Sequence, residues 1–206
     1  MLREQAPGTL APVSGLPARW VVDIIQDRAG RVWVAFAARD GASGRQPGRL
    51  FVGEGGGWRE LRVDEQRLRH YRRFSAASRH RPPCDFLLST DVADIQPLRD
   101  GRVALATAEG LVLHDGRSAK CFGPMEGLPV PAVARVREDA RGRIFFFGYG
   151  GRVHWLDGRL HVYHTVDRAR GLFRRDPVDV WTDPEDRLWV LDEDGAVGVA
   201  PIGRLY

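Results

Sequence analysis

The chain has 206 residues, of which 43% are hydrophobic and 28% charged, and its formal net charge is +4. A chain of this length can bury a sizeable core, and we expect a single domain over residues 1–206. No stretch approaches about 18 apolar residues, which excludes a membrane-spanning helix, and residues 1–15 lack the apolar core of a signal peptide. We therefore expect a soluble cytoplasmic protein, or a periplasmic one if the chain is part of a longer membrane sensor.

A sequence pattern recurs four times along the chain. Without gaps, residues 15–36 align with residues 86–107, 127–148 and 171–192. One aligned column holds leucine, two hold aliphatic residues, and a fourth holds arginine in all four copies. The last three copies begin at residues 86, 127 and 171, which gives periods of 41 and 44 residues. Such periods are typical of propeller blades and of some helical arrays.

Each copy predicts two short strands joined by a tight turn. In the first copy, the apolar runs Val21–Ile25 and Val32–Phe36 are too short for helices, which favours strands. Asp accepts backbone N–H groups in such turns, and Gly adopts positive φ without steric cost. In the last copy, Asp186 takes the place of that glycine. The residues predicted to hold the turn and the following strand are Asp27, Gly30, Gly101, Asp139, Gly142, Asp183, Trp33 and Trp189.

A third and a fourth strand are expected after each pair. The third strands are expected at residues 48–57, 110–116, 151–158 and 195–203, and the fourth strands at 58–63, 119–122 and 160–165. In the last copy, the outer strand is either the short segment 204–206 or a strand lent by residues 8–13, which would pair the two ends of the chain.

The second strand of each copy is apolar on both faces of its pleat. Val32 and Val34 point one way, and Trp33 and Ala35 point the other. A strand buried on both faces needs a neighbouring sheet on each side, which radially stacked blades supply. The predicted fold is all-β: a β-propeller with four recognisable blades of about four antiparallel strands, and a short helical insertion in the first repeat. The blades are expected at residues 15–63, 86–122, 127–165 and 171–206.

Two recurring columns have both a structural and a functional interpretation. We expect the aromatic column, Trp33, Phe145 and Trp189, to pack between blades rather than to line a pocket. A ring formed by the arginine column could bind an anion, but we favour pairing with an acidic neighbour in the next blade, since a position set by every repeat is usually structural. The arginine column consists of Arg31, Arg102, Arg143 and Arg187.

The first period spans 71 residues, from 15 to 86, and its excess length falls in two insertions. One is a Gly- and Ser-containing loop at residues 39–48. The other, residues 62–83, carries seven arginines against one Asp and one Glu, a net charge of +5. Asp64 is a suitable N-cap for a short amphipathic helix with Leu68 and Tyr71 on its apolar side, and two prolines end the insertion.

The basic insertion has two interpretations. In the one that we favour, the helix is solvated and its apolar side covers the outer strand of a blade. In the other, the insertion docks an acidic protein partner. We expect no nucleic-acid partner, because no recognised nucleic-acid-binding fold accompanies the basic residues. The candidate docking residues are Arg67, Arg69, Arg72, Arg73, Arg79 and Arg81.

Reactive chemistry has little support in the sequence. Cys84 and Cys121 are too few for a disulfide framework, and we expect free thiols because the N-terminus indicates a reducing compartment. His70, His80 and Cys84 fit no common zinc-ligand spacing, and no P-loop, dinucleotide fingerprint or nucleophile elbow is present. We expect no metal, no cofactor and no catalytic residue, and hence a protein that is not an enzyme.

The first copy, GLPARWVVDIIQDRAGRVWVAF, resembles the repeat of the two-component regulator propeller family. That repeat runs Gly-Leu-Pro, a valine and isoleucine strand, Asp-x-x-Gly and an aliphatic-Trp strand, with Gly-Leu commonly at the third strand. Gly110 and Leu111 match the last feature. The second copy departs from the pattern, because it lacks Gly-Leu-Pro and has Ala104 in the tryptophan column.

The resemblance implies a sensory role, since propellers of this family form the extracytoplasmic sensors of bacterial histidine kinases. It implies a non-enzymatic propeller that binds a small molecule or a glycan within a two-component-type signalling system. The alternative is an interaction scaffold that docks a protein through the basic insertion. Family members more often have six to eight blades, so the chain is a segment of a longer sensor, a small closed ring, or one part of a ring that two chains complete. An open arc exposes apolar faces, which soluble proteins rarely tolerate, so we expect closure or partnership.

Overall fold

The computed structural model describes residues 2–6, 9–41, 44–74, 83–148, 150–156 and 163–205. This part of the chain is mostly β-strand. The strands are β1 (Leu2–Ala6), β2 (Thr9–Pro12), β3 (Val21–Gln26), β4 (Val32–Phe36), β5 (Arg39–Gly41), β6 (Gly44–Gln46), β7 (Arg49–Glu54), β8 (Gly57–Leu61), β9 (Val92–Pro97), β10 (Val103–Thr107), β11 (Gly110–His114), β12 (Ala119–Phe122), β13 (Arg135–Glu138), β14 (Ile144–Phe147), β15 (Arg152–Leu156), β16 (Tyr163–Asp167), β17 (Pro177–Thr182), β18 (Arg187–Asp192) and β19 (Val197–Pro201). The helix α1 is Glu65–Tyr71, and 3-10 turns lie at Pro124–Glu126, Arg168–Arg170 and Ile202–Arg204.

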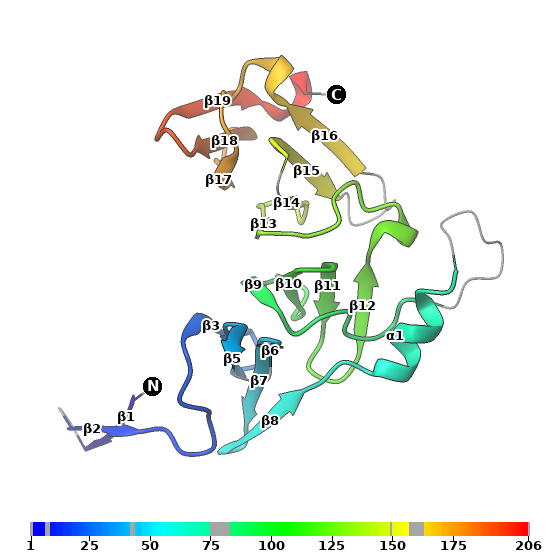
Figure 1. Ribbon diagram of the computed structural model, residues 1–206. Coiled ribbons are helices and arrows are strands. Elements are labelled where there is room, and N and C mark those ends of the chain that lie inside the picture. Colours follow the sequence, from blue (N-terminus) through cyan, green and yellow to red (C-terminus); the bar gives the residue numbers. More distant parts are fainter. Residues whose placement is uncertain are drawn as a thin grey trace.

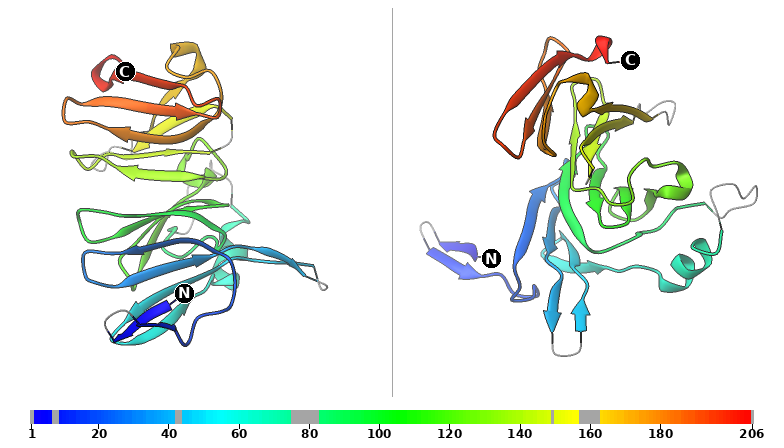
Figure 2. Two further views of the ribbon diagram at one scale, coloured as in Figure 1. Left: turned by 90° about the vertical axis from the view of Figure 1, so that its left-hand side faces the viewer. Right: turned by 45° about the horizontal axis from the view of Figure 1, so that its top comes forward.

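Four larger antiparallel sheets follow one another along the chain. Their strand orders are β3-β4-β7-β8 in sheet 1, β9-β10-β11-β12 in sheet 2, β13-β14-β15-β16 in sheet 3 and β17-β18-β19 in sheet 4. The first strand of each sheet contacts the first strand of the next. The sheets therefore form an arc in chain order (Figure 1), and from the side they lie stacked on one another (Figure 2). This is a propeller-like β fold.

The arc departs from the predicted four-bladed propeller in three places. Sheet 4 has three strands, because the chain after β19 forms a 3-10 turn instead of an outer strand. The strand β2 pairs with β1 in a separate two-stranded sheet and does not complete sheet 4. A further two-stranded sheet, β5-β6, occupies the segment expected to be a loop. Within the described residues no sheet joins the two ends of the chain, and the arc is open (Figure 1).

One buried carboxylate organises the turn between the first two strands of sheet 1. Asp27 accepts the backbone N–H groups of Ala29 and Arg31, each at 2.9 Å. The same carboxylate accepts the Arg31 Nε–H at 2.7 Å and the Trp33 indole N–H at 2.8 Å. Burial alone would raise the pKa of Asp27, but the hydrogen bonds from Trp33 and Arg31 outweigh it and the pKa is lowered. The turn is therefore fixed by an ionised group.

The same turn recurs in the other sheets with changes. Asp183 in sheet 4 binds the Arg187 Nε–H and the Trp189 indole N–H, both at 2.6 Å, and Asp139 in sheet 3 binds the Arg143 Nε–H at 2.6 Å. The expected left-handed positions have positive φ: 78° at Gly30, 89° at Gly101, 78° at Gly142 and 62° at Asp186.

The arginine column pairs within its own turn, and the prediction of pairing with the next blade is wrong for most of it. Arg31, Arg143 and Arg187 each bind the Asp four residues earlier. Arg102 binds Asp100 at 2.5 Å, since the second copy has its carboxylate at a different turn position. Arg143 also forms an ion pair with Asp186 of the following sheet, and Arg31 donates to the backbone carbonyl of Asp115 in sheet 2. The physical reason is that the backbone turn already brings a carboxylate beside each guanidinium.

The apolar core lies between consecutive sheets. We call the face of each sheet that points toward the next sheet its forward face, and the opposite one its backward face. As expected, Trp33 and Phe145 are buried between sheets, whereas Trp189 lies on the forward face of sheet 4 and is half-buried. The second-strand residues that share a core cluster across each junction are Trp33 and Ala35 with Val103 and Leu105, Ala104 and Ala106 with Ile144 and Phe146, and Phe145 and Phe147 with Leu188 and Val190.

Replacing Asp27 with alanine should destabilise the protein, because the substitution leaves buried backbone and indole N–H groups without an acceptor. We expect the free energy of unfolding to fall by roughly 2–4 kcal/mol. Asp100→Ala is the matched control: this carboxylate also binds an arginine, but its side chain is 48% exposed, so water can replace it and the loss should stay below about 1 kcal/mol. Urea denaturation of both variants measures the difference, and equal losses would contradict the role of Asp27.

Two histidines are buried in the sheets in a neutral state. Burial lowers the pKa of His114 to about 4, with opposing influence from Asp115. Its Nδ1 accepts the Gly116 N–H at 2.8 Å. Burial likewise lowers the pKa of His154 to about 4, and its Nδ1 lies 2.7 Å from the Thr165 hydroxyl. Protonation of either ring in the folded protein is therefore unfavourable.

These histidines should make the protein sensitive to acid. Because the folded pKa lies below the ordinary value of 6.5, the unfolded chain takes up protons first. The contribution of each histidine to the free energy of unfolding is therefore fully present above pH 6.5. It is lost as the pH falls toward 4, by up to roughly 3 kcal/mol for each histidine. His154→Gln should flatten this pH dependence in chemical denaturation, whereas His70→Gln, at an exposed position, should leave it unchanged. Identical pH profiles for the two variants would contradict the assignment.

Candidate functional site

The basic insertion forms the helix α1 over the edge of sheets 1 and 2. Asp64 caps it, as predicted, by accepting the N–H groups of Gln66 at 3.1 Å and Arg67 at 3.0 Å. Leu68 and Tyr71 are both 4% exposed and belong to the core cluster between the two sheets. The helix is thus anchored through its apolar side, and it ends at Tyr71, well before the prolines that were expected to end it.

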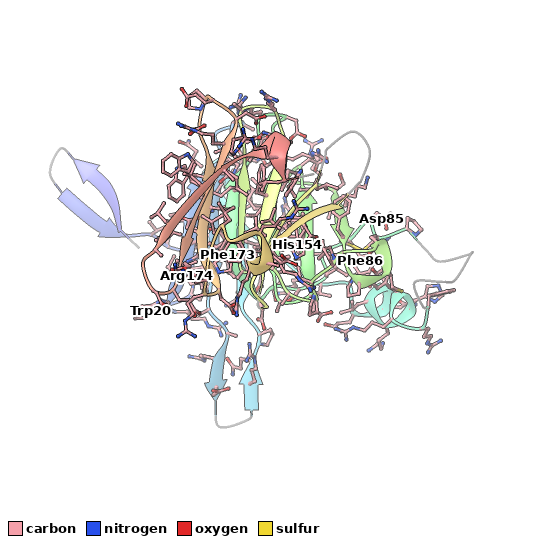
Figure 3. The ribbon with its side chains drawn as sticks, turned by 90° about the horizontal axis from the view of Figure 1, so that it is seen from above. Trp20, Asp85, Phe86, His154, Phe173 and Arg174 are labelled. Atoms are coloured by element: carbon pink, nitrogen blue, oxygen red, sulfur yellow. A yellow bond between two sulfur atoms is a disulfide. The ribbon has the colours of Figure 1, made fainter. Side chains whose placement is uncertain are left out.

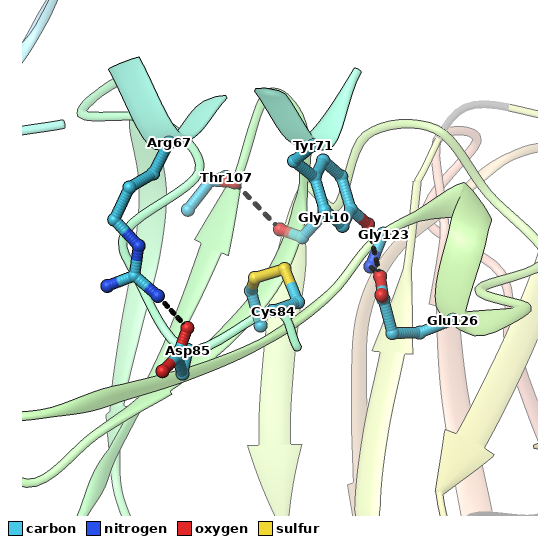
Figure 4. Close-up of a disulfide and its surroundings, with 9 residues drawn as sticks. Arg67, Tyr71, Cys84, Asp85, Thr107, Gly110, Gly123 and Glu126 are labelled. Carbon is cyan, nitrogen blue, oxygen red and sulfur yellow. Dashed lines mark hydrogen bonds and ion pairs between the residues drawn. A yellow bond between two sulfur atoms is a disulfide. The ribbon is translucent and has the colours of Figure 1, made fainter. Parts of the chain in front are cut away.

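A hydrogen-bonded carboxylate joins the end of α1 to sheet 2. The Tyr71 hydroxyl donates to the carboxylate of Glu126, and the same carboxylate accepts the Gly123 N–H at 2.9 Å (Figure 4). Glu126 lies in the 3-10 turn that follows β12. The position of the helix therefore depends on a residue 55 positions further along the chain.

A disulfide between Cys84 and Cys121 ties the segment after the insertion to β12 (Figure 4). Their Cα atoms lie 5.1 Å apart, and the Cys121 N–H donates to the Cys84 carbonyl at 2.8 Å. The prediction of free thiols is therefore wrong. The two residues are 37 positions apart in sequence, and only the pairing of the returning segment with the edge strand brings them together.

The predicted docking arginines are only partly available on the surface of α1. Arg67 forms an ion pair with Asp85, and its guanidinium lies 5.0 Å from the Phe86 ring. Figure 3 labels Asp85 and Phe86 beside the helix. Arg72 binds Glu109 at 2.5 Å. Two further candidates, Arg69 and Arg73, are exposed. The remaining candidates, Arg79 and Arg81, lie outside the described residues, as does His80. Partner docking by this set stays a prediction.

A polar cleft of about 960 Å³ lies between sheet 1, α1 and the segment that leads into sheet 2. Its walls come from elements far apart in sequence, namely the loop before β3, the β5-β6 hairpin, β8 and α1. Five arginines and four carboxylates line it: Arg19, Arg39, Arg49, Arg62 and Arg72, and Glu60, Glu65, Asp91 and Glu109. The cleft is therefore close to electrically balanced, with one excess positive charge.

Several of the lining charges are already paired. Glu60 binds Arg49 Nε at 2.5 Å and Arg62 at 2.8 Å. The hydrogen bond from Arg49, opposed by burial and assisted by Arg62, lowers the pKa of Glu60 to about 2. This carboxylate is therefore ionised at neutral pH, and it holds two guanidinium groups in place.

Two lining arginines have no carboxylate partner among the described residues. Arg19 donates from its two terminal nitrogens to the Pro47 carbonyl at 3.4 and 3.3 Å, and its buried Nε has no partner within the described chain. Arg39 donates to the Gln46 side chain at 3.0 Å. Both guanidinium groups bind the segment of Gln46 and Pro47, which also lines the cleft.

The polar groups of the cleft are mainly guanidiniums and carboxylates. In the described lining there is no histidine or cysteine, and the lining hydroxyls belong to Ser89 and Thr90. The carboxyl groups with raised pKa lie elsewhere: burial raises the pKa of Asp94 and of Glu138 at junctions between sheets. Over the described ranges, no cluster of three or more potential metal ligands occurs.

Sequence reasoning located the insertion but missed most of the cleft. Arg19, Arg49 and Glu60 carried no signal in the repeat columns, because they lie in the loop before β3 and on the outer strands. The useful signal was the excess length of the first period, since both of its insertions contribute to the cleft walls.

The fold and the cleft define a propeller-like β protein with a polar cleft at one edge. No protein-family model matches the sequence, and no curated protein matches it. Solved structures share its fold. The extracellular domain of BT3049 from B. thetaiotaomicron, described as a hybrid two component system, matches 91% of this chain with a TM-score of 0.67 at 14% identity. The extracellular domain of BT4673 from the same organism, described as a one component system, matches 90% with a TM-score of 0.58 at 13% identity.

PorZ, a surface component of the type-IX secretion system of Porphyromonas gingivalis, matches 90% of this chain with a TM-score of 0.52 at 16% identity. The chain covers 24% of the BT3049 and BT4673 domains and 25% of PorZ, so it spans about a quarter of the length of these structures. At these identities the likeness shows the fold. None of the helices in the described chain is long and apolar enough to cross a membrane.

The disulfide should stabilise the protein. Replacing both cysteines with serine should lower the free energy of unfolding by roughly 2–4 kcal/mol, because the cross-link restricts the unfolded chain. Alkylation of the denatured wild-type protein without reductant should label neither cysteine, and mass spectrometry measures this directly. Labelling of both cysteines in freshly purified protein would show that the thiols are free.

Proposed function

We propose that the chain is a non-enzymatic sensor module that binds a small acidic ligand, such as a glycan fragment with a carboxylate, in the cleft beside α1. The observation that carries the proposal is the pair of lining arginines, Arg19 and Arg39, that no carboxylate neutralises. Guanidinium groups recognise carboxylates through paired, charge-assisted hydrogen bonds. The surrounding hydroxyls and ion pairs offer further hydrogen-bonding partners to a polyhydroxylated ligand.

The sensory part of the proposal draws support from the likeness to extracellular domains of BT3049 and BT4673, which are described as two component and one component systems. The disulfide adds independent support, since disulfides persist in oxidising compartments outside the cytoplasm. We infer a role in a bacterial two-component-type system in which occupation of the cleft changes the position of α1, because Leu68 and Arg72 of the helix form part of its wall.

A scaffold function is the second candidate, and the exposed Arg69 and Arg73 favour it. Arg69 lies on α1 and Arg73 follows its C-terminal end, both with side chains in solvent, and nothing in the described chain forms an ion pair with them. An acidic protein segment would find these charges on a helix that is firmly anchored to the sheets. Such docking should be sensitive to salt, because it would depend on exposed charges.

Calorimetric titration with trigalacturonate tests the ligand proposal, with the neutral sugar cellotriose as the control ligand. We expect the acidic sugar to bind more tightly than the neutral one. Arg19→Ala should weaken the binding of the acidic sugar about tenfold, because the variant loses one charge-assisted contact. Arg117→Ala removes an exposed arginine outside the cleft and should change nothing.

Absence of binding by the acidic sugar, or an equal loss in both arginine variants, would overturn the ligand proposal. The scaffold function predicts a different pattern in the same assay. An acidic peptide should then bind the wild type and the Arg19→Ala variant equally and lose its affinity when Arg69 and Arg73 are both replaced with glutamine.

A further inference from the structure

The two ends of the arc present sheet faces that have no neighbouring sheet in the described chain. At each of the three internal junctions, the forward face of one sheet packs on the backward face of the next. The forward face of sheet 4 and the backward face of sheet 1 remain. These are the two complementary halves of one more junction of the same kind.

The forward face of sheet 4 is apolar and exposed. In its central row, Trp181 pairs with Trp189 and Trp189 with Val199. The two indoles stack with their centroids 5.9 Å apart and an interplanar angle of 14°. Trp181 is 41% exposed and Val199 46% exposed, and the next row adds Val197 at 54%. A row of this kind at an internal junction, such as the one containing Trp33, is buried.

The backward face of sheet 1 is apolar too, and its first strand is exposed. Its central row consists of Ile24, Val34 and Phe51, in register across β3, β4 and β7. Val34 and Phe51 are buried in a cluster that Leu16 and Trp58 cover, whereas Ile24 is 48% exposed and Val22 on the same strand is 39% exposed. The equivalent row in sheet 2, which contains Ile95 and Leu105, lies wholly in the core between sheets 1 and 2.

A hydrogen bond found at two of the three internal junctions also marks the unfilled junction. The Asp23 carboxylate of sheet 1 accepts the Ile95 N–H of sheet 2 at 2.8 Å, and Asp94 of sheet 2 accepts the Val136 N–H of sheet 3 at 2.9 Å. Asp179 occupies the same aligned position in sheet 4. Its Oδ1 accepts the N–H of Val180, as the Oδ1 of Asp23 accepts that of Ile24, and also contacts Arg137. Within the described residues no sheet follows it, and its side chain is 42% exposed.

We infer that a second copy of this chain completes the junction: the forward face of sheet 4 in one copy docks on the backward face of sheet 1 in the other. The Asp179 carboxylate then lies beside the Ile24 N–H of the second copy, which within one chain donates to Asp23 at 2.8 Å. The occupant is a second copy because each chain carries both complementary faces, and the contact continues a packing pattern that the chain already uses three times. Two such head-to-tail junctions close a two-chain ring. The inference does not depend on the ligand proposed above.

Sedimentation velocity and light scattering over a range of concentrations test the junction. We expect the wild-type chain to form a dimer with twice the chain mass of 23.0 kDa. Val199→Asp on the forward face and Ile24→Asp on the backward face should each give monomers, because both junctions of the dimer then carry a charge in an apolar contact. Arg170→Asp, which places the same charge on an exposed turn, should remain dimeric. Circular dichroism confirms that each variant is folded.

Mixing the two monomeric variants gives a result that only a head-to-tail contact predicts. In a mixed dimer, one junction carries both substitutions and the other carries neither, so association should return in part. If each face instead packed against the same face of another copy, mixing the two variants would not restore association. Asp179→Ala leaves both faces apolar and should raise the dissociation constant of the dimer about tenfold. This variant tests the junction even if the substitutions to aspartate impair folding.

A wild-type chain that stays monomeric at all concentrations would overturn the inference. So would dimers that persist in both aspartate variants, or folded variants that stay monomeric when mixed.

Discussion

A β-sheet that is apolar on both faces cannot stand alone in water, and this constraint governs the whole molecule. Each of the four larger sheets buries its second strand from both sides wherever a neighbouring sheet exists. Stacking in an arc satisfies the requirement at three junctions. At the ends, the second strand of sheet 1 is buried under Leu16 and Trp58, whereas the second strand of sheet 4 stays half-exposed on one face. The same requirement places α1, whose apolar side covers the core between the first two sheets. The stacking of the sheets and the position of the insertion are thus consequences of one hydrophobic demand.

The sequence predicted those features that depend on residues close together in the chain. The tight turns followed from Asp and Gly at fixed offsets, the N-cap of α1 from Asp64, and β12 from its apolar pattern with its observed bounds. Features that depend on distant segments were missed. The disulfide requires the chain after the insertion to return to an edge strand, and the arginine column was assigned partners in the wrong sheet because the buried turn carboxylate was not recognised as an acceptor for side chains.

The candidate site shows why function was harder to foresee than fold. The repeat columns specify the parts of the blade that every copy shares, and those parts are buried. The cleft is built from the segments that the repeat does not contain, namely the hairpin β5-β6, the helix α1 and the loop before β3. In these segments charge matters more than periodicity, and a single residue such as Glu60 positions two arginines at once. Only three-dimensional proximity reveals such a group.

The contact between Arg143 and Asp186 has a consequence for how the repeats evolve. Asp186 occupies a left-handed position with a φ of 62°, where glycine serves in the other copies, and it binds Arg143 and Arg141 from the preceding sheet. A backbone conformation that disfavours aspartate is thereby offset by ion pairs that glycine could not make. Two neighbouring copies have become mutually dependent, so exchanging one of them for another copy of the repeat would break a contact that neither sequence reveals alone.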